Sequence, residues 1–185
     1  MSVILPVARR NGRLIECVES ICRQDYERLE ILLLRTSDDP VTKETCDQAA
    51  QTDPRIRYMS LEGDVNIARN LGLENATGRY IQFCSGSEML GEGFYTTLIG
   101  QMEERGANVA CFGYRNAKGS IRCRNAFNGT GNLFGLMDLA LTDEGSSSEY
   151  TGYGVTLENK LFRRDAIFSD ETPVSFETCQ YDMTD

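Results

Sequence analysis

Residues 64–83 read DVNIARNLGLENATGRYIQF and contain a complete helix-to-strand unit. Asp64 belongs to the residue types that cap helix N-termini, so we predict a helix from Val65 to Asn75. Gly78 is expected to end that helix, because glycine is favoured just past helix C-termini. Tyr80 to Cys84 is then an apolar run of the length of a buried strand. This stretch predicts one unit of a layered α/β domain.

The same alternation of strands and helices continues on both sides of this unit. Further strands are predicted over residues 2–7, 30–34, 56–59 and 108–114, with 120–124 pairing beside the last through a turn at 118–119. Helices are predicted over residues 14–22, 40–50, 93–104 and 135–141. The pattern indicates an α/β fold, with a mostly parallel, Rossmann-like central sheet and helices on both faces. Ligands in such sheets bind at the carboxyl ends of the strands, which places residues 8–12, 35–39 and 85–88 along one rim.

Composition limits the function classes. The 185 residues suit a single domain over 1–185, and the net charge of −9 argues against a nucleic-acid partner, which would call for a basic face. No apolar run approaches the roughly 20 residues of a transmembrane helix. The start, MSVILPVARR, places its arginines after the apolar residues, the reverse of a signal peptide. We therefore expect a protein that is cytoplasmic or peripheral at the inner membrane surface.

The chain has seven cysteines and no histidine. Without histidine there is no Ser-His-Asp or Cys-His nucleophile system, and this weakens a third hypothesis, a cysteine-dependent enzyme centred on Cys84. The cysteines are scattered without a CxxC pair, so the sequence does not predict a zinc site. Reduced, buried thiols are the expectation.

Four stretches resemble the family-2 glycosyltransferases, which have the GT-A fold and transfer sugars from nucleotide diphosphates. They are SVILPV (2–7), IECVESICRQDYERLEILLL (15–34), DVNIARNLGLENATGRYIQF (64–83) and ENKLFRRDAI (158–167). The resemblance implies that Pro6, Val7, Arg35, Arg69, Ser85 and Ser87 bind a nucleotide-diphosphate sugar, with a UDP-sugar expected first.

Two of the family's motifs are altered. The family has aspartates directly after the second strand, one of which accepts a hydrogen bond from uracil, and Arg35 and Thr36 stand there. Arginine only donates, so Arg35 is suited to a ring carbonyl or a phosphate. Asp38 and Asp39 follow, and they either substitute for the missing aspartates or, for Asp39, cap the next helix.

The second altered motif is the family's Asp-x-Asp, which holds Mg²⁺ or Mn²⁺ against the donor diphosphate. Ser85, Gly86 and Ser87 stand at its positions, and hydroxyls are poor ligands for such cations compared with carboxylates. Glu88 is the one nearby candidate for a metal ligand, and its alternative is a solvated loop residue.

The family's catalytic base corresponds to Asp182, in Gln180-Tyr181-Asp182. The resemblance implies an inverting transfer to a glycan or lipid-linked acceptor, in surface polysaccharide synthesis, with an acceptor side extending past residue 185. Arg69 would help to balance phosphate charge. The altered motifs motivate an alternative: a catalytically degenerate transferase domain that acts as a binding or assembly module.

Overall fold

The computed structural model describes residues 1–112, 114–116, 119–121, 157–158, 160–169 and 172–176. Its centre is a six-stranded sheet in the order β3-β2-β1-β4-β8-β5. The strands are β1 (Ser2–Val7), β2 (Glu30–Arg35), β3 (Ile56–Ser60), β4 (Tyr80–Phe83), β8 (Lys160–Arg163) and β5 (Val109–Cys111). The pairs among β1 to β4 are parallel, whereas β8 runs antiparallel to both β4 and β5. The predicted mostly parallel sheet is confirmed.

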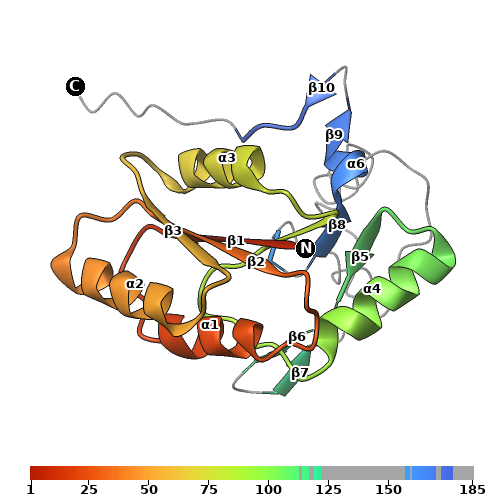
Figure 1. Ribbon diagram of the computed structural model, residues 1–185, viewed down its shortest axis with the longest axis horizontal. Helices are drawn as coiled ribbons and strands as arrows, with labels where there is room; N and C mark the ends of the chain where they lie inside the picture. The colour runs from red at the N-terminus through yellow and green to blue at the C-terminus, as the bar shows by residue number, and fades with distance from the viewer. Residues whose placement is uncertain (113, 117–118, 122–156, 159, 170–171, 177–185) are drawn as a thin grey trace, which may run out of the picture.

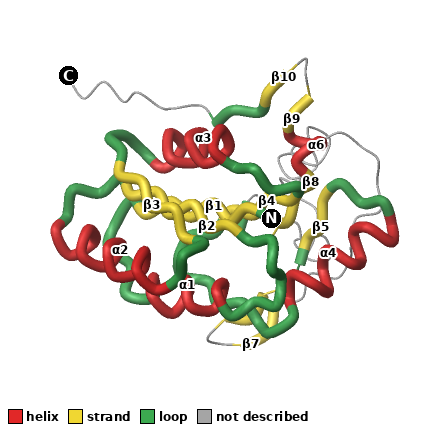
Figure 2. The backbone as a smooth tube through the Cα atoms, in the orientation of Figure 1, coloured by secondary structure: helices red, strands yellow, loops and turns green. Residues whose placement is uncertain are grey.

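Helices cover both faces of this sheet, as predicted (Figures 1 and 2). α1 (Leu14–Cys22), α2 (Pro40–Thr52) and α4 (Phe94–Arg105) lie on one face, and α3 (Val65–Asn75) lies on the other. Alternate residues of each strand supply the two cores, so Leu33 faces the first layer while Leu32 and Leu34 face α3. A short helix, α6 (Arg164–Ile167), follows β8 and joins the core on the α3 side.

Local caps explain where two helices begin. Asp39 accepts a hydrogen bond from the Thr42 N–H at 2.8 Å, and Pro40 takes the first helical position of α2. Asp64 accepts from Asn66 and Ile67 at 2.8 and 2.9 Å. Both caps satisfy N–H groups that have no partner within the helix, which confirms the predicted helix starts.

The expected role of Gly78 is wrong. α3 ends at Asn75 with Ala76 in an extended conformation, and Gly78 is not in the left-handed region. A Cβ atom at Gly78 would instead lie 2.5 Å from the Met1 carbonyl carbon. Glycine is needed here because two backbone segments pass each other closely.

Three strand predictions need correction. Cys84 lies one residue beyond β4, and the strand expected over 108–114 is β5 alone, which ends at Cys111. The strand expected over 120–124 is β7 (Gly119–Ile121), which pairs antiparallel with β6 (Tyr114–Asn116) in a separate sheet and not with β5, and residues 122–124 lie outside the described residues. Another short pair joins β9 (Phe168–Ser169) and β10 (Thr172–Pro173). No strand was predicted for β8, whose pairing partners β4 and β5 lie far away along the chain. The helix expected over 135–141 lies outside the described residues.

Candidate functional site

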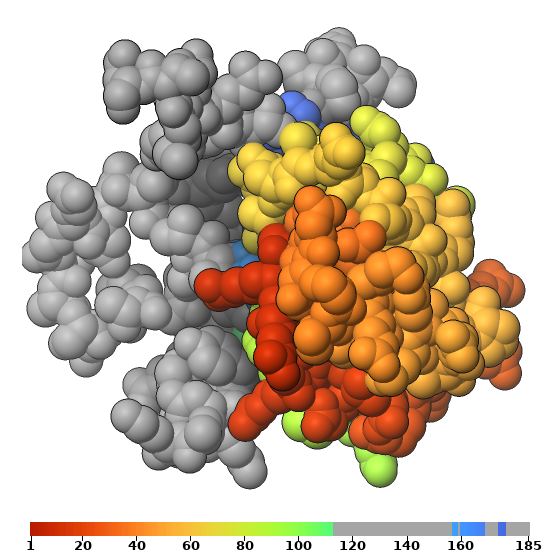
Figure 3. Space-filling model, turned by 90° about the vertical axis from the view of Figure 1, so that its left-hand side faces the viewer, coloured from red at the N-terminus to blue at the C-terminus, as the bar shows by residue number. Residues whose placement is uncertain are grey.

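The carboxyl ends of β1 and β2 lie side by side. Pro6 and Val7 pair in register with Leu34 and Arg35, and the Thr36 N–H donates to the Val7 carbonyl at 3.1 Å. Figure 3 shows the molecule from the side toward which β1 runs in Figure 1. Both Pro6 and Val7 are buried, so their contribution to this edge is backbone and shape.

The loop after β4 joins the same edge. Residues 85–88, called the rim loop below, contact the loop after β1, because Asn11 Nδ2 donates to the Ser85 carbonyl at 3.4 Å. Gly86 has a φ of +80°, and a Cβ atom there would lie 3.2 Å from Asn11 Nδ2. The structure therefore brings residues 8–12 and 85–88 together, as the topology predicts.

Arg35 is a buried cation whose hydrogen-bond acceptors are all neutral. Its side chain donates to the Tyr58 hydroxyl at 2.8 Å, to Ser60 Oγ at 2.5 Å and to the Ser37 carbonyl. Only 9% of the residue is exposed, and no carboxylate in the described part of the chain forms an ion pair with it. An anionic ligand would supply the missing counter-charge.

Sequence reasoning missed the residues that hold Arg35. Tyr58 and Ser60 lie two positions apart on β3, so their side chains point to the same face of the sheet. Ser60 pairs directly with Arg35 in the β2–β3 register. The sequence does show two hydroxyl residues two positions apart at the end of a predicted strand, which places them on one face of the sheet. Only the strand register shows that both accept hydrogen bonds from Arg35.

The structure supports the cap for Asp39. Its Oδ2 atom accepts from both the backbone N–H and the Oγ1 hydroxyl of Thr42, at 2.8 and 2.7 Å. These two bonds are the main causes that hold the pKa of Asp39 below its ordinary value. Asp39 is therefore occupied at the start of α2, while Asp38 is exposed.

Glu88 organises the rim loop from within. Its carboxylate accepts from the Ser85 N–H at 2.9 Å, the Ser87 N–H at 3.2 Å and Ser85 Oγ at 2.5 Å. The two serine hydroxyls lie 2.9 Å apart, and both serines are exposed. Glu88 is therefore a loop residue whose charge holds the loop together, and its role as a metal ligand stays a prediction.

Arg69 and Asn70 lie on α3, on the opposite face of the sheet from α1. Arg69 contacts Asn66 Oδ1 at 3.0 Å, forms an ion pair with Glu158 at 3.4 Å and stacks over the Phe176 ring. None of these partners belongs to the rim loop or to residues 35–39. The positive charge of Arg69 is therefore already partly matched by Glu158.

Asn70 holds the backbone of Phe176, a contact that the sequence did not predict. The Asn70 amide donates to the Phe176 carbonyl at 2.9 Å and accepts from its N–H at 2.7 Å. Phe176 also packs edge-on against Phe83, with ring centroids 5.5 Å apart. These contacts fix the segment that leads toward Asp182, and Asp182 itself lies outside the described residues.

The hypothesis of a Cys84 nucleophile finds no support. A hydrogen bond with Cys17, together with burial, raises the pKa of the Cys84 thiol well above its ordinary value. The residue is also only 2% exposed. A neutral, buried thiol is neither reactive nor accessible to a substrate.

Comparison with known proteins identifies curated glycosyltransferases that are similar to this chain in sequence. A curated relative, the glycosyltransferase GlyG of Streptococcus pneumoniae, is 32% identical over 118 residues, covering 63% of this chain and 39% of GlyG. A Campylobacter jejuni protein described as GalNAc(5)-diNAcBac-PP-undecaprenol beta-1,3-glucosyltransferase is 30% identical over 112 residues, covering 59% of this chain and 36% of that protein. The chain thus spans well under half the length of these two relatives.

The fold matches solved structures. Staphylococcus aureus TarS 1–349 in complex with UDP superposes with a TM-score of 0.65 at 17% identity, covering 89% of this chain and 46% of that one. The likeness confirms the predicted GT-A fold. None of the helices in the described ranges is both long and apolar enough to cross a membrane. The model of the family described as "Glycosyl transferase family 2" matches residues 2–167, and the chain belongs to that family.

Proposed function

We propose that this chain is the donor-binding part of a glycosyltransferase that moves a sugar from a nucleotide diphosphate to an acceptor hydroxyl. The family match over residues 2–167 carries the proposal. The acceptor is a glycan or lipid-linked sugar of a surface polysaccharide. The Campylobacter relative, described as acting on an undecaprenol-linked saccharide, supports this class of acceptor. TarS, whose structure with UDP-GlcNAc has the same fold, supports a UDP-sugar as the donor.

The nucleotide is proposed to lie along the edge formed by β1, β2 and the rim loop. Pro6 and Val7 would shape the floor, and Arg35 would donate to a carbonyl of the base or to a phosphate. Arg35 is better suited than Arg69 to meet negative charge, because Arg69 is already paired with Glu158. Ser85 and Ser87 are both exposed. The Ser87 hydroxyl would donate to the diphosphate or the sugar, whereas Ser85, whose hydroxyl already donates to Glu88, would accept from a sugar hydroxyl.

The residues present do not fit a hard divalent cation in the manner of the family. Mg²⁺ and Mn²⁺ are held by carboxylates and other hard oxygen ligands, and the rim loop offers two serine hydroxyls and one carboxylate. That carboxylate, Glu88, already accepts three hydrogen bonds from its own loop. The proposal is therefore a variant of the Asp-x-Asp motif in which protein donors carry more of the charge stabilisation.

Asp182 is proposed as the catalytic base. Its carboxylate would take the proton of the acceptor hydroxyl as that oxygen attacks the anomeric carbon. A new glycosidic C–O bond forms while the bond between the sugar and the diphosphate breaks, and the nucleoside diphosphate leaves with the bonding pair. Attack from the side opposite the leaving group inverts the anomeric configuration.

Calorimetry with UDP, UDP-sugars and GDP-sugars, each with and without Mn²⁺, tests donor binding. We expect a UDP-sugar to bind and Mn²⁺ to change its affinity by less than threefold. Arg35→Gln should weaken the UDP complex. A matched control, Arg23→Gln, removes an exposed arginine directly after α1 and should leave binding unchanged.

Transfer is then measured by release of UDP in the presence of undecaprenol-linked acceptors. Release that disappears in Asp182→Asn supports the enzyme. Binding of a UDP-sugar without turnover by any acceptor would favour the binding or assembly module instead. No response to any nucleotide would contradict both the donor and the site.

A further inference from the structure

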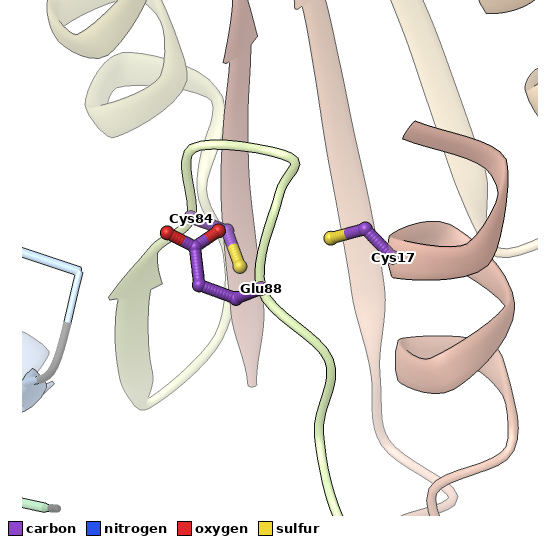
Figure 4. Close-up of side chains that lie close together, drawn as sticks. All are labelled: Cys17, Cys84 and Glu88. Carbon is purple, nitrogen blue, oxygen red and sulfur yellow. The ribbon is translucent and has the colours of Figure 1, made fainter. Parts of the chain in front are cut away.

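Two thiols and a carboxylate from three parts of the chain meet beneath the rim loop. Cys17 lies on α1, Cys84 directly follows β4, and Glu88 belongs to the rim loop itself. Their ligand atoms, the two Sγ atoms and one carboxylate oxygen, all lie within 4.8 Å of one another. Figure 4 shows Cys17 pointing from α1 toward Cys84, with the Glu88 carboxylate beside Cys84. We propose that these three residues form a zinc site.

The geometry suits a tetrahedral zinc ion. With Zn–S bonds of about 2.3 Å, two tetrahedral thiolate ligands stand about 3.8 Å apart. From a separation of at most 4.8 Å, each pair of ligand atoms needs to move together by about 1 Å. A Cys17–Cys84 disulfide would require the sulfur atoms to approach to about 2.05 Å and would not involve Glu88. Three protein ligands leave the fourth position to water or another small ligand.

Tyr95 gives an independent indication of a ligand at this place. It is fully buried, and its hydroxyl has no hydrogen-bond partner among the described residues. Tyr95 lies in the same hydrophobic core as Cys17 and Cys84. A buried O–H donor without an acceptor is costly, and a metal-bound thiolate would accept from it.

Zinc also resolves the charge state of the buried thiols. Cys17 and Cys84 are both buried, so a thiolate at either position would need a counter-charge. Binding of Zn²⁺ forms two Zn–S bonds and one Zn–O bond and releases the two thiol protons to solvent. The Zn²⁺ charge then offsets two thiolates and the Glu88 carboxylate, leaving one net negative charge for the Tyr95 hydroxyl and nearby N–H groups to solvate.

The site would fix the rim loop to the body of the domain. Glu88 binds its own loop through Ser85 and Ser87, and its carboxylate also forms a hydrogen bond with the Cys84 thiol. Coordination by zinc would connect that loop to α1 through Cys17 and to β4 through Cys84. The role is structural and does not depend on the proposed sugar transfer, so the two hypotheses can fail separately.

Titration of the reduced, purified protein with Co²⁺, followed by displacement with Zn²⁺, tests the site. We expect one Co²⁺ per chain, thiolate-to-cobalt charge-transfer absorption and the visible bands of tetrahedral cobalt. Cys17→Ser and Cys84→Ser should abolish the charge-transfer band or halve it. Cys46→Ser removes a fully buried thiol on α2 that is not part of the cluster, and this matched control should keep the full spectrum.

Two milder variants keep the test decisive where a serine variant fails to fold. Glu88→Gln should weaken metal binding tenfold or more, and Tyr95→Phe by about tenfold, with the circular dichroism spectrum unchanged. Equal spectra in Cys17→Ser and Cys46→Ser would overturn the proposal. So would binding that is indifferent to both milder variants, or a Cys17–Cys84 disulfide found by mass spectrometry in the protein as isolated.

Discussion

Arg35 raises the question of what a buried guanidinium does among neutral acceptors. Three of its N–H groups bind oxygens of Tyr58, Ser60 and Ser37, which orients the side chain but leaves its charge unmatched. Burying a charge without a counter-charge has an electrostatic cost, which an anionic ligand would offset. A variant of Arg35 can therefore show whether this side chain binds a phosphate or the base of the nucleotide.

The distinction predicts different effects on two ligands. Arg35→Gln should weaken UDP binding about 10- to 100-fold, because a hydrogen bond to a charged group contributes about 1.5–3 kcal/mol. Binding of uridine, which has no phosphate, should change by less than threefold. Calorimetry with both ligands measures this. An equal loss for uridine and UDP would assign Arg35 to the base instead.

Gly78 makes a prediction about stability. A Cβ atom at this position would lie 2.5 Å from the Met1 carbonyl carbon and 2.6 Å from the Ser2 nitrogen, and backbone atoms cannot move aside cheaply. Gly78→Ala should therefore lower the free energy of unfolding by about 2 kcal/mol or more.

Gly100 provides the matched comparison. It is exposed within α4, and a Cβ atom there meets nothing within 4 Å. Gly100→Ala should raise the free energy of unfolding by about 0.5–1 kcal/mol, because alanine is the better helix former. Urea denaturation of both variants gives the values. A Gly78→Ala protein as stable as the wild type would show that the close approach is relaxed in solution.

At the scale of elements, the sequence predicted what short-range chemistry determines. Asp39 and Asp64 cap helices through bonds that span two or three residues, so the helix starts were visible in the sequence. In contrast, β8 pairs with β4 and β5, which lie far away along the chain, and no local pattern within Lys160–Arg163 indicates these partners.

The candidate site also has one part that the sequence predicted and one part that it did not. The rim followed from the rule that parallel strands open at their carboxyl ends, and the structure joins its loops through Asn11 and Ser85. The Cys17–Cys84 pair was missed because a spacing rule such as CxxC detects only ligands on one turn. Here α1 and the end of β4 each supply one thiol, and only the folded chain brings them together.

The contact between α3 and the Phe176 segment also depends on tertiary structure. Asn70 makes two hydrogen bonds to the Phe176 backbone, at 2.9 and 2.7 Å. Asn70→Ala should cost about 1–3 kcal/mol of unfolding free energy and speed hydrogen exchange at the Phe176 amide. Asn70→Asp keeps the acceptor for that amide and should preserve more of its protection. Hydrogen-exchange mass spectrometry compares the two. Equal hydrogen exchange at the Phe176 amide in the wild type and in Asn70→Ala would show that Asn70 does not hold this segment.

Across the whole molecule, the two edges of the sheet differ in how their charges are used. At the amino edge, Glu30 accepts from Ser2 Oγ at 2.6 Å and from the Thr77 N–H at 2.7 Å, linking β1, β2 and the turn before β4. Asp53 receives a two-pronged hydrogen bond from Arg55, at 2.9 and 2.7 Å. The carboxyl edge instead has the unmatched Arg35 and the exposed serines of the rim loop. The matched carboxylates of Glu30 and Asp53 thus lie at one edge, and the groups proposed to bind the donor lie at the other.

The carboxylates at the amino edge predict how the free energy of unfolding depends on pH. The side-chain hydrogen bonds from Arg55 lower the pKa of Asp53 from 3.8 to about 2. Burial opposes ionisation of Glu30, but its hydrogen bonds with Ser2 and Thr77 outweigh burial and lower the pKa of that carboxyl too. A depressed pKa in the folded state stabilises the fold above the unfolded-state pKa. That stabilisation is lost as the pH falls through the folded-state pKa. The free energy of unfolding should therefore drop between about pH 4 and pH 2.

Urea denaturation across this range measures the slope, and two variants assign it. Asp53→Asn should be less stable than the wild type at neutral pH and should lose less stability on acidification, because it has no proton to take up at that position. Asp47→Asn is the matched control. Its carboxylate lies in an exposed ion pair with Lys43, which solvent screens, so its removal should leave the slope almost unchanged. If the two variants, Asp53→Asn and Asp47→Asn, lose the same amount of unfolding free energy as the pH falls, the Asp53–Arg55 contact does not stabilise the amino edge in solution. The acid dependence would then have to come from Glu30 and its partners.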